Sequence, residues 1–291
     1  MNASTNPFHR VALIGVGLIG GSWGLALKHR GFAGRIVGCD RPQVLDRALE
    51  LGAIDEAEPD LAASVRGAGL VILAAPVAAI LEQLPQIKEV ASPQAMVTDT
   101  GSTKRAILAR ARMIFGEEPL FLGAHPLAGK EQSGIENANA SLFESARYVV
   151  TPLAPSHLQD QRVEALLAMV RGVGARPFVT DADTHDRALA LLSHLPQLVS
   201  TGLASLIAAE DHRHTLPLEL AAAGFRDMTR LAESPYAVWH DVCLTNGDNL
   251  RPAIDSLIRK LEAMKERLGN DGLKQEFDEA LKLRDQWRKT R

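Results

Sequence analysis

The stretch of sequence that decides the fold is Gly15-Val16-Gly17-Leu18-Ile19-Gly20, which has the glycine spacing GxGxxG. The apolar run 11–14 precedes it and indicates a strand, and residues 22–29 after it indicate a helix. A second strand over residues 35–39 leads directly to Asp40, 20 residues beyond Gly20. Strand, glycine turn, helix, strand and acid in this order are typical of a Rossmann-type dinucleotide-binding unit.

Each glycine of this loop has a separate physical role. Gly15 permits the tight turn, Gly17 lets the backbone approach a pyrophosphate, and Gly20 lets the helix pack on the strand. We expect Asp40 to accept hydrogen bonds from ribose hydroxyls and to repel a 2'-phosphate, which favours NAD over NADP. Arg41 leaves a role for NADP open, because a basic residue here can stack on adenine or tolerate that phosphate. A glycine-rich turn can also close a unit that binds nothing.

Further short apolar runs continue the pattern of strands, and most are separated by helix-length segments. They cover residues 70–74, 96–98, 121–124, 148–151 and 177–179. Strands that alternate with helices predict an α/β fold with a doubly wound, mostly parallel sheet. No strand-like run follows Thr180, so we expect a Rossmann domain over residues 1–180 and an all-helical domain over residues 181–291.

Two segments of the helical part carry unusual apolar patterns. Residues 188–209 are apolar nearly all round, and a helix of this kind must be deeply buried. Seven apolar residues further on share one helix face, namely Leu250, Ile254, Leu257, Ile258, Leu261, Met264 and Leu268. Both observations predict a homodimer that forms through the helical domain.

Composition excludes several classes of protein. A length of 291 residues favours two domains, and a net charge of -3 argues against nucleic-acid binding. Residues 1–10 lack the apolar core of a signal peptide, and the longest apolar run, 70–81, has only 12 residues and contains a proline. Two distant cysteines indicate neither a disulfide framework nor a zinc site. We therefore expect a cytoplasmic protein without a metal centre or a membrane span.

Five further motifs occur in a fixed order after the glycine loop. They are Ala74-Ala75-Pro76, Asp99-Thr100-Gly101-Ser102-Thr103-Lys104, Gly123-Ala124-His125-Pro126-Leu127-Ala128-Gly129, Ser193-His194-Leu195-Pro196 and Gly224-Phe225-Arg226-Asp227-Met228-Thr229-Arg230. The first three follow predicted strands, where an open α/β sheet binds its ligands. The whole set resembles the prephenate and arogenate dehydrogenase family, from residue 11 to about residue 268.

The resemblance implies NAD-dependent oxidative decarboxylation of prephenate or arogenate on the route to tyrosine. It places Ala75, Pro76, Thr100 and Gly101 at the cofactor. His125 would accept the proton of the ring hydroxyl, a task that suits a residue whose pKa is ordinarily about 6.5. We expect a neighbouring Arg230 to lower that pKa and Glu131 to raise it.

Ser102 matches the family serine that hydrogen-bonds the ring hydroxyl and the catalytic histidine. It is also a candidate N-cap, because residues 103–111 look helical.

The substrate carries carboxylates, which guanidinium groups bind well. By resemblance Arg230 holds the ring carboxylate, Arg226 is a candidate for the side-chain carboxylate, and His194 lies beside the substrate. Gln197 stands where several relatives have a second histidine, so the choice between prephenate and arogenate stays open. Glu131 fits the polar entrance of the pocket, although a surface carboxylate explains it nearly as well.

Other polar residues receive simpler interpretations. Asp99 and Lys104 are expected to be loop and surface residues without a role in the chemistry. His185 with Asp183 and Asp186 suggests a metal site, but acidic residues at the start of a helix explain the cluster more simply.

Two alternative functions remain from the residues alone. A β-hydroxyacid or 6-phosphogluconate-type dehydrogenase shares the predicted layout but relies on a lysine, and residues 184–210 contain none. A non-catalytic NAD sensor would need only the dinucleotide loop.

Overall fold

The strands form one sheet in a computed structural model that describes residues 7–116, 120–214, 216–269 and 271–290. Its order is β3-β2-β1-β4-β5-β6-β7-β8, and every neighbouring pair is parallel except β6 with β7. The strands are β1 (Arg10–Ile14), β2 (Arg35–Cys39), β3 (Glu56–Ala57), β4 (Leu70–Leu73), β5 (Met96–Asp99), β6 (Leu120–Pro126), β7 (Arg147–Pro152) and β8 (Arg176–Val179). The predicted doubly wound, mostly parallel sheet is confirmed, with the short strand β3 as an addition.

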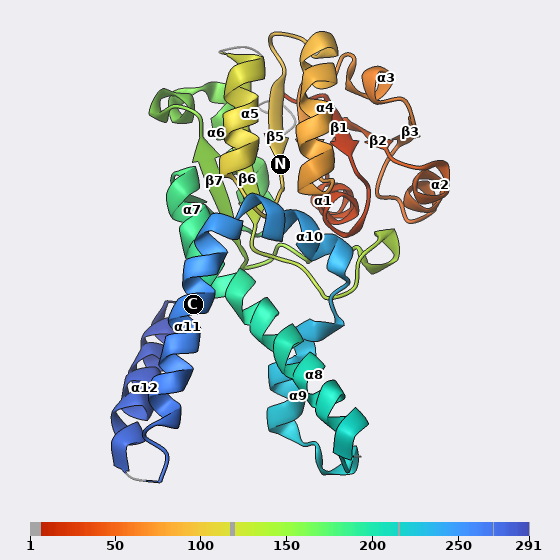
Figure 1. The fold of residues 1–291 in the computed structure, drawn as a ribbon. Coiled ribbons are helices and arrows are strands. Elements are labelled where there is room, and N and C mark those ends of the chain that lie inside the picture. Colours follow the sequence, from red (N-terminus) through yellow and green to blue (C-terminus); the bar gives the residue numbers. More distant parts are fainter. Residues whose placement is uncertain (1–6, 117–119, 215, 270, 291) are drawn as a thin grey trace.

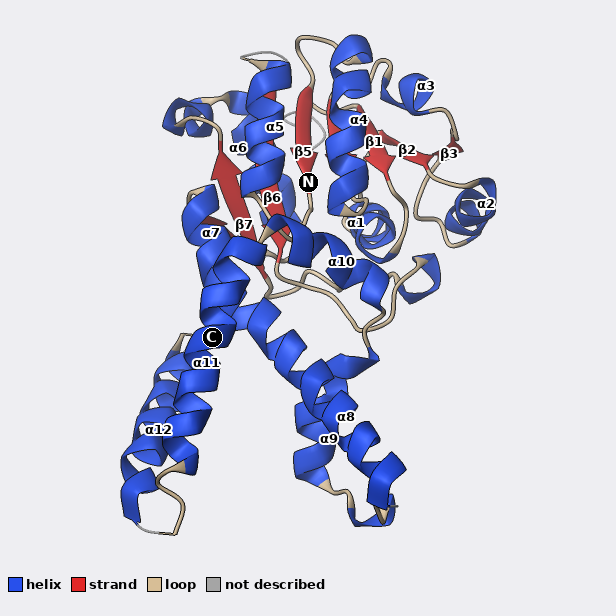
Figure 2. Cartoon of the chain, in the orientation of Figure 1, coloured by secondary structure: helices blue, strands red, loops and turns tan. Residues whose placement is uncertain are grey.

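Helices cover both faces of this sheet (Figures 1 and 2). Side chains alternate along β1, so that Val11 and Leu13 enter one hydrophobic core while Ala12 and Ile14 enter the other. The first core is completed by α1 (Leu18–His29), α2 (Pro42–Glu50) and α6 (Gln161–Gly172), and the second by α3 (Leu61–Val65), α4 (Val77–Val90) and α5 (Arg105–Phe115). The apolar runs of the strands are therefore explained by burial on two sides.

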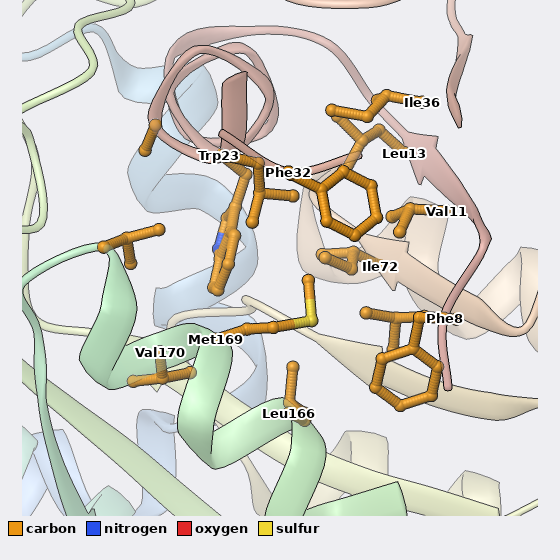
Figure 3. Close-up of a cluster of buried hydrophobic side chains, with 14 of the residues drawn as sticks. Phe8, Val11, Leu13, Trp23, Phe32, Ile36, Ile72, Leu166, Met169 and Val170 are labelled. Atoms are coloured by element: carbon orange, nitrogen blue, oxygen red, sulfur yellow. The ribbon is translucent and has the colours of Figure 1, made fainter. Parts of the chain in front are cut away.

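The first core is built around a buried aromatic side chain. Trp23 of α1 lies 5.4 Å from Phe143 and 5.7 Å from Tyr148 between ring centroids, and Figure 3 shows Met169 of α6 beside it. All four side chains are 1% exposed or less. Such burial fixes α1 against the sheet, and with it the glycine loop at the start of that helix.

The helical part begins at α7 (Ala182–Leu189), which continues through a π-helical segment, η3 (Ala190–His194), into α8 (Leu195–His214). Then follow η4 (Leu218–Leu220), α9 (Ala223–Thr229), η5 (Arg230–Glu233), α10 (Tyr236–Thr245), α11 (Gly247–Lys265), η6 (Asp271–Leu273) and α12 (Lys274–Lys289). Figure 1 shows α7 and α10 against the sheet domain, while α8 with α9 and α11 with α12 extend from it as two arms.

Large apolar side chains of both arms face solvent in the single chain. Leu206 of α8 is 58% exposed, Leu261 of α11 is 55% exposed and Phe277 of α12 is 67% exposed. The continuous helix Ala182–Arg213 is long and apolar enough to cross a membrane by length and composition alone, and only 22% of its most apolar window is buried. A single chain therefore does not provide the deep burial that the sequence predicts for residues 188–209.

The turn after β5 differs from the prediction. The helix there begins at Arg105 with Lys104 as its N-cap, two residues later than expected, and the Lys104 side chain does not cap it. Ser102 is therefore not the N-cap, because Asp186 already accepts hydrogen bonds from the backbone N–H groups of Lys104 and Arg105. Ser102 is left free for another role.

The glycine loop provides a matched pair of variants. A Cβ on Gly20 would lie 1.9 Å from the carbonyl oxygen of Gly15, whereas a Cβ on Gly17 would meet nothing within 4 Å. Gly20→Ala should therefore destabilise the fold by about 1–3 kcal/mol through overpacking, a fall in Tm of roughly 3–10 °C. Gly17→Ala should lower Tm by no more than about 2 °C, since it loses only a modest N-cap preference. Equal Tm values for Gly17→Ala and Gly20→Ala in thermal denaturation would contradict the steric requirement for glycine at residue 20.

Candidate functional site

A groove of about 600 Å³ lies at the carboxyl ends of β1, β2 and β4. Its lining includes six residues that the sequence assigns to the cofactor, namely Gly15, Gly17, Asp40, Arg41, Ala75 and Pro76. Gly15 has φ +87° and contacts the backbone of Ala74, so the tight turn requires glycine there. The open space at Gly17 leaves room for a phosphate group near the start of α1.

Asp40 has a structural role in this groove that the sequence did not reveal. Its carboxylate accepts hydrogen bonds from the backbone N–H groups of Val16, at 2.8 Å, and Arg41, at 2.7 Å. It thus ties the glycine loop to the end of β2, while 20% of the side chain stays exposed to the groove. The Arg41 side chain is 82% exposed and its Nε lies 3.9 Å from the carboxylate.

The other predicted cofactor residues lie around this groove rather than among its lining residues. Leu18 and Ile19 form the first turn of α1. Thr100 and Gly101 form the turn after β5, where the Thr100 N–H donates to the Leu73 carbonyl oxygen at 2.9 Å. These four residues therefore shape the edge of the sheet next to the groove.

A second hollow of about 430 Å³ lies between the sheet edge and the helical part. Ser102, after β5, and His125, at the end of β6, form the sheet side, and His194 and Trp239 form the helical side. Sequence motifs about 70 residues apart, those of His125 and His194, thus meet in one pocket. Its remaining lining is largely apolar, which suits a ring-shaped organic molecule.

The π-helical segment η3 places His194 in the pocket. Pro196 has no N–H to donate to the carbonyl oxygen four residues before it, so regular α-helical bonding is interrupted at this point. His194 is 2% exposed, and its Nδ1 lies 3.1 Å from the side-chain nitrogen of Asn246. Burial lowers the pKa of His194 to about 4, so the ring is neutral at physiological pH.

His125 contacts a second histidine, His185, for which the sequence predicts only a place at a helix start. Its Nδ1 lies 3.0 Å from Nε2 of His185, and Nδ1 of His185 lies 2.7 Å from the carboxylate of Asp186. Burial, together with nearby His185, Lys104 and His194, lowers the pKa of His125 well below its ordinary value. Burial and these neighbours, and not Arg230 and Glu131 as the sequence suggested, therefore shift the pKa of His125.

The interpretation of Asp99 and Lys104 as loop and surface residues is wrong. Both side chains are completely buried and form an ion pair. Lys104 Nζ also donates to the carbonyl oxygen of Ala124, at 2.6 Å, and Asp99 accepts from the N–H of the same residue, at 3.1 Å. Because Ala124 immediately precedes His125, the buried pair holds the strand that presents the histidine.

The helix-start explanation of the acidic cluster is also only partly right. Asp181 caps α7 through the Thr184 N–H, and Asp183 lies in the first turn. Asp186 and His185, by contrast, are 0% and 2% exposed and belong to the buried network at His125. No group of three or more metal-ligating side chains suited to a metal ion occurs among the described residues.

Arg230 and Glu131 form an ion pair outside the residues that line this pocket. Glu131 lies on the loop whose residues 127–129 line the pocket, and Arg230 begins η5. The Arg230 side chain is 57% exposed and does not line the pocket itself. Arg226 is 74% exposed on α9 and pairs with its neighbour Asp227 at 3.3 Å, so the single chain does not bring it to the pocket.

Gln197 is buried in α8 and supports the segment that carries Arg230. Its side-chain nitrogen donates to the Leu231 carbonyl oxygen at 2.7 Å, and it does not line the pocket. Trp239 is a pocket residue that sequence reasoning missed. Its indole Nε1 is buried without a hydrogen-bond partner among the described residues, so a donor is available to a ligand.

Comparisons with known proteins agree with this arrangement. The family model for the prephenate dehydrogenase nucleotide-binding domain matches residues 23–179, and the one for its dimerization domain matches residues 181–283. Prephenate dehydrogenase of Bacillus subtilis is 34% identical over 257 residues, which are 88% of this chain and 69% of that relative. Cyclohexadienyl dehydrogenase of Zymomonas mobilis is 30% identical over 282 residues and 95% of each chain.

Among solved structures, prephenate dehydrogenase from Aquifex aeolicus in complex with hydroxyphenyl propionate and NAD+ has a TM-score of 0.84 and 29% identity. The likeness covers 97% of this chain and 98% of that one. The β-hydroxyacid dehydrogenase alternative has no comparable support. With both family models matched in sequence order, the chain belongs to the prephenate dehydrogenase family.

Proposed function

We propose that the protein is a cytoplasmic oxidoreductase of tyrosine biosynthesis that catalyses NAD-dependent oxidative decarboxylation of prephenate or arogenate. The observation that carries the proposal is the position of His125, a neutral imidazole in a pocket between the sheet edge and the helical part. Relatives are named prephenate dehydrogenase, cyclohexadienyl dehydrogenase and, for a solved structure from Synechocystis, arogenate dehydrogenase, and the fold and pocket of this chain suit the same reaction.

The groove fits a dinucleotide. Gly17 leaves space for a pyrophosphate at the start of α1, and Asp40 offers its exposed edge to ribose hydroxyls. The same carboxylate disfavours a 2'-phosphate, so NAD is the expected cofactor. When bound, NAD accepts the hydride that leaves the ring carbon carrying the hydroxyl group.

His125 supplies the acid-base chemistry. Its ring accepts the proton of the substrate hydroxyl as that group becomes a carbonyl. Loss of the ring carboxylate as carbon dioxide then leaves an aromatic phenolate, which takes the proton back from His125. Ser102 lines the same pocket and would hydrogen-bond the same hydroxyl. His194 is neutral and buried beside the pocket, so it holds substrate without competing for the proton.

Arg230 is the proposed anchor for the ring carboxylate. Its present partner Glu131 is 28% exposed, so a substrate carboxylate can exchange with it at modest cost. Arg226 would reach the second carboxylate only if its exposed side chain leaves Asp227. Gln197 acts indirectly, because its side chain fixes the backbone next to Arg230.

We also propose a homodimer, with residues 1–180 and 181–291 as its Rossmann and helical domains. The dimerization-domain match and the exposed apolar side chains of both arms support it. A second chain would cover those side chains and bury the long apolar helix, which explains its composition without a membrane.

A steady-state assay of prephenate and arogenate, each with NAD and with NADP, tests the function. We expect reduced cofactor to form with at least one substrate and NAD to be preferred. Asp40→Ser should narrow that preference by about tenfold, because the repulsion of a 2'-phosphate is removed. No reduced cofactor with either substrate would favour the NAD-sensor alternative, and equal kcat/KM for both cofactors in the wild type would refute the role of Asp40.

The pH profile tests His125. The base must be unprotonated, so kcat/KM should fall as pH drops through a free-enzyme pKa that lies below 6.5 and should be flat just above it. His125→Asn keeps a hydrogen-bonding group without a proton acceptor and should reduce kcat by about 10²- to 10⁴-fold.

Arg230→Ala provides the contrast for this test. A carboxylate anchor binds ground state and transition state alike, so the loss should appear mainly in KM. If His125→Asn kept kcat within a few-fold and retained the acid limb, the base would lie elsewhere.

Light scattering tests the dimer. The wild type should have a mass of twice 31.4 kDa at micromolar concentration. Leu206→Glu, on the exposed face of α8, should shift the protein toward the monomer, since a charge is then buried in an apolar interface. Met113→Glu is the matched control, because Met113 is 73% exposed on α5 of the sheet domain. A stable active wild-type monomer would exclude an obligate dimer.

A further inference from the structure

The orientation of His125 is determined by a contact outside the pocket. Its Nδ1 lies 3.0 Å from Nε2 of His185, and the two rings meet edge to face with centroids 5.2 Å apart. Only Nε2 of His125 is then available to a molecule in the pocket. Which of the two nitrogens carries the proton decides whether His125 can act as a base.

The far side of His185 fixes the direction of this hydrogen bond. Its Nδ1 lies 2.7 Å from Asp186 Oδ1, and a carboxylate only accepts. Burial alone would raise the pKa of Asp186, but hydrogen bonds from His185 and from the N–H groups of Arg105 and Lys104 lower it. Asp186 is therefore ionised, and Nδ1 of His185 must carry a proton.

The remaining assignments follow from this one. In the neutral form of His185, a proton on Nδ1 leaves a lone pair on Nε2, which can only accept a hydrogen bond. His125 must donate it from Nδ1, so its own Nε2 is left without a proton. This nitrogen is the base required by the chemistry.

We propose that His185, held by Asp186, is a positioning residue that keeps His125 in the tautomer with a free lone pair on Nε2. The inference rests on the proposed function. His185 does not line the pocket and takes no proton in the reaction; it acts as a hydrogen-bond acceptor for His125. In a catalytic triad, the aspartate holds the histidine in the tautomer that can accept a proton. His185 and Asp186 would hold His125 in the same way, so that it can accept the proton of the ring hydroxyl.

The charges around the two histidines are consistent with this role. Lys104 approaches from the start of α5 and is neutralised by Asp99 of β5, while His194 faces them from η3. Arg105 lies 3.6 Å from Asp186 on the side away from His185. Burial is the main reason that a second proton on His125 is disfavoured, so the geometry is set for the neutral ring.

Two substitutions of His185 separate acceptance of a hydrogen bond from simple packing. His185→Phe keeps a ring of similar size but removes the acceptor. A buried Nδ1–H without an acceptor is disfavoured, so the active tautomer of His125 should become the minor one and kcat should fall about 10- to 100-fold. KM should change by less than about threefold, since the pocket lining is intact. His185→Gln ends in an amide oxygen that can accept from His125, and it should restore kcat to within about fivefold of the wild type.

His240→Phe is the matched control. His240 also contacts the next residue, with Nδ1 2.9 Å from the carboxylate of Asp241, but it does not line the pocket or contact His125. The kcat of the His240→Phe variant should stay within about twofold of the wild-type value. Thermal melting of each variant separates folding from catalysis.

Nitrogen-15 NMR of labelled histidines gives a readout without substrate. The wild type should show His125 protonated on Nδ1 and bare on Nε2, and His185→Phe should show a mixture. A wild-type proton on Nε2 of His125, unchanged kcat in folded His185→Phe, or failure of His185→Gln to restore kcat would each overturn the proposal. Because the tautomer is measured without turnover, a failure of the proposed reaction itself would appear instead in the wild-type assay.

Discussion

The carboxylate of Asp186 accepts hydrogen bonds from two parts of the molecule at once. It belongs to α7 of the helical part, yet it is bound by the backbone N–H groups of Lys104, at 2.7 Å, and Arg105, at 2.9 Å, in the sheet domain. A buried anion is tolerated only with such partners, and the start of a helix offers both unpaired N–H groups and a favourable dipole. The position of the helical part over the sheet edge, and hence the pocket between them, depends on this contact.

The buried pair of Asp99 and Lys104 applies the same constraint from inside the sheet domain. Between them the two side chains contact both the N–H and the carbonyl oxygen of Ala124, one residue before His125. Removing one partner would leave an uncompensated buried charge, which is far costlier than losing a surface ion pair. His125 is thus fixed through its backbone by one ionic network and through its ring by another. A base must be held at hydrogen-bonding distance from the substrate hydroxyl, and both networks contribute to that position.

The parts of this structure that sequence predicts are those encoded locally. Two-sided burial gives β1 its apolar run. The positive φ of Gly15 and the contact of Gly20 with the Gly15 carbonyl oxygen require glycine at both positions, so a short stretch of sequence carries the signal. The burial of Lys104 and His185 could not be predicted because it depends on strands and helices that meet only in the fold. Lys104 Nζ binds the carbonyl oxygen of Ala124, 20 residues further on, and His125 and His185 are 60 residues apart. A lysine in a polar loop and a histidine at a helix start resemble solvated residues until the fold brings partners to them. Among the residues of the candidate site, His194 is accompanied by a local signal. Pro196 lies inside the same helical segment and predicts irregular helical hydrogen bonding near His194.

The substrate side of the pocket depends on α8 in a way that joins assembly to activity. Arg230 lies on η5, and η5 is attached to α8 by Gln197, which binds the Leu231 carbonyl oxygen, and by Ser200, whose hydroxyl accepts from the Ala232 N–H at 3.1 Å. The opposite apolar face of α8 is exposed in the single chain. In the proposed dimer a second copy packs on that face and restricts the helix, and the restriction passes through two hydrogen bonds to the backbone beside Arg230. Dimer formation would then lower the entropic cost of substrate binding. The chemical step, fixed by Asp186 and Lys104 within one chain, would be unaffected.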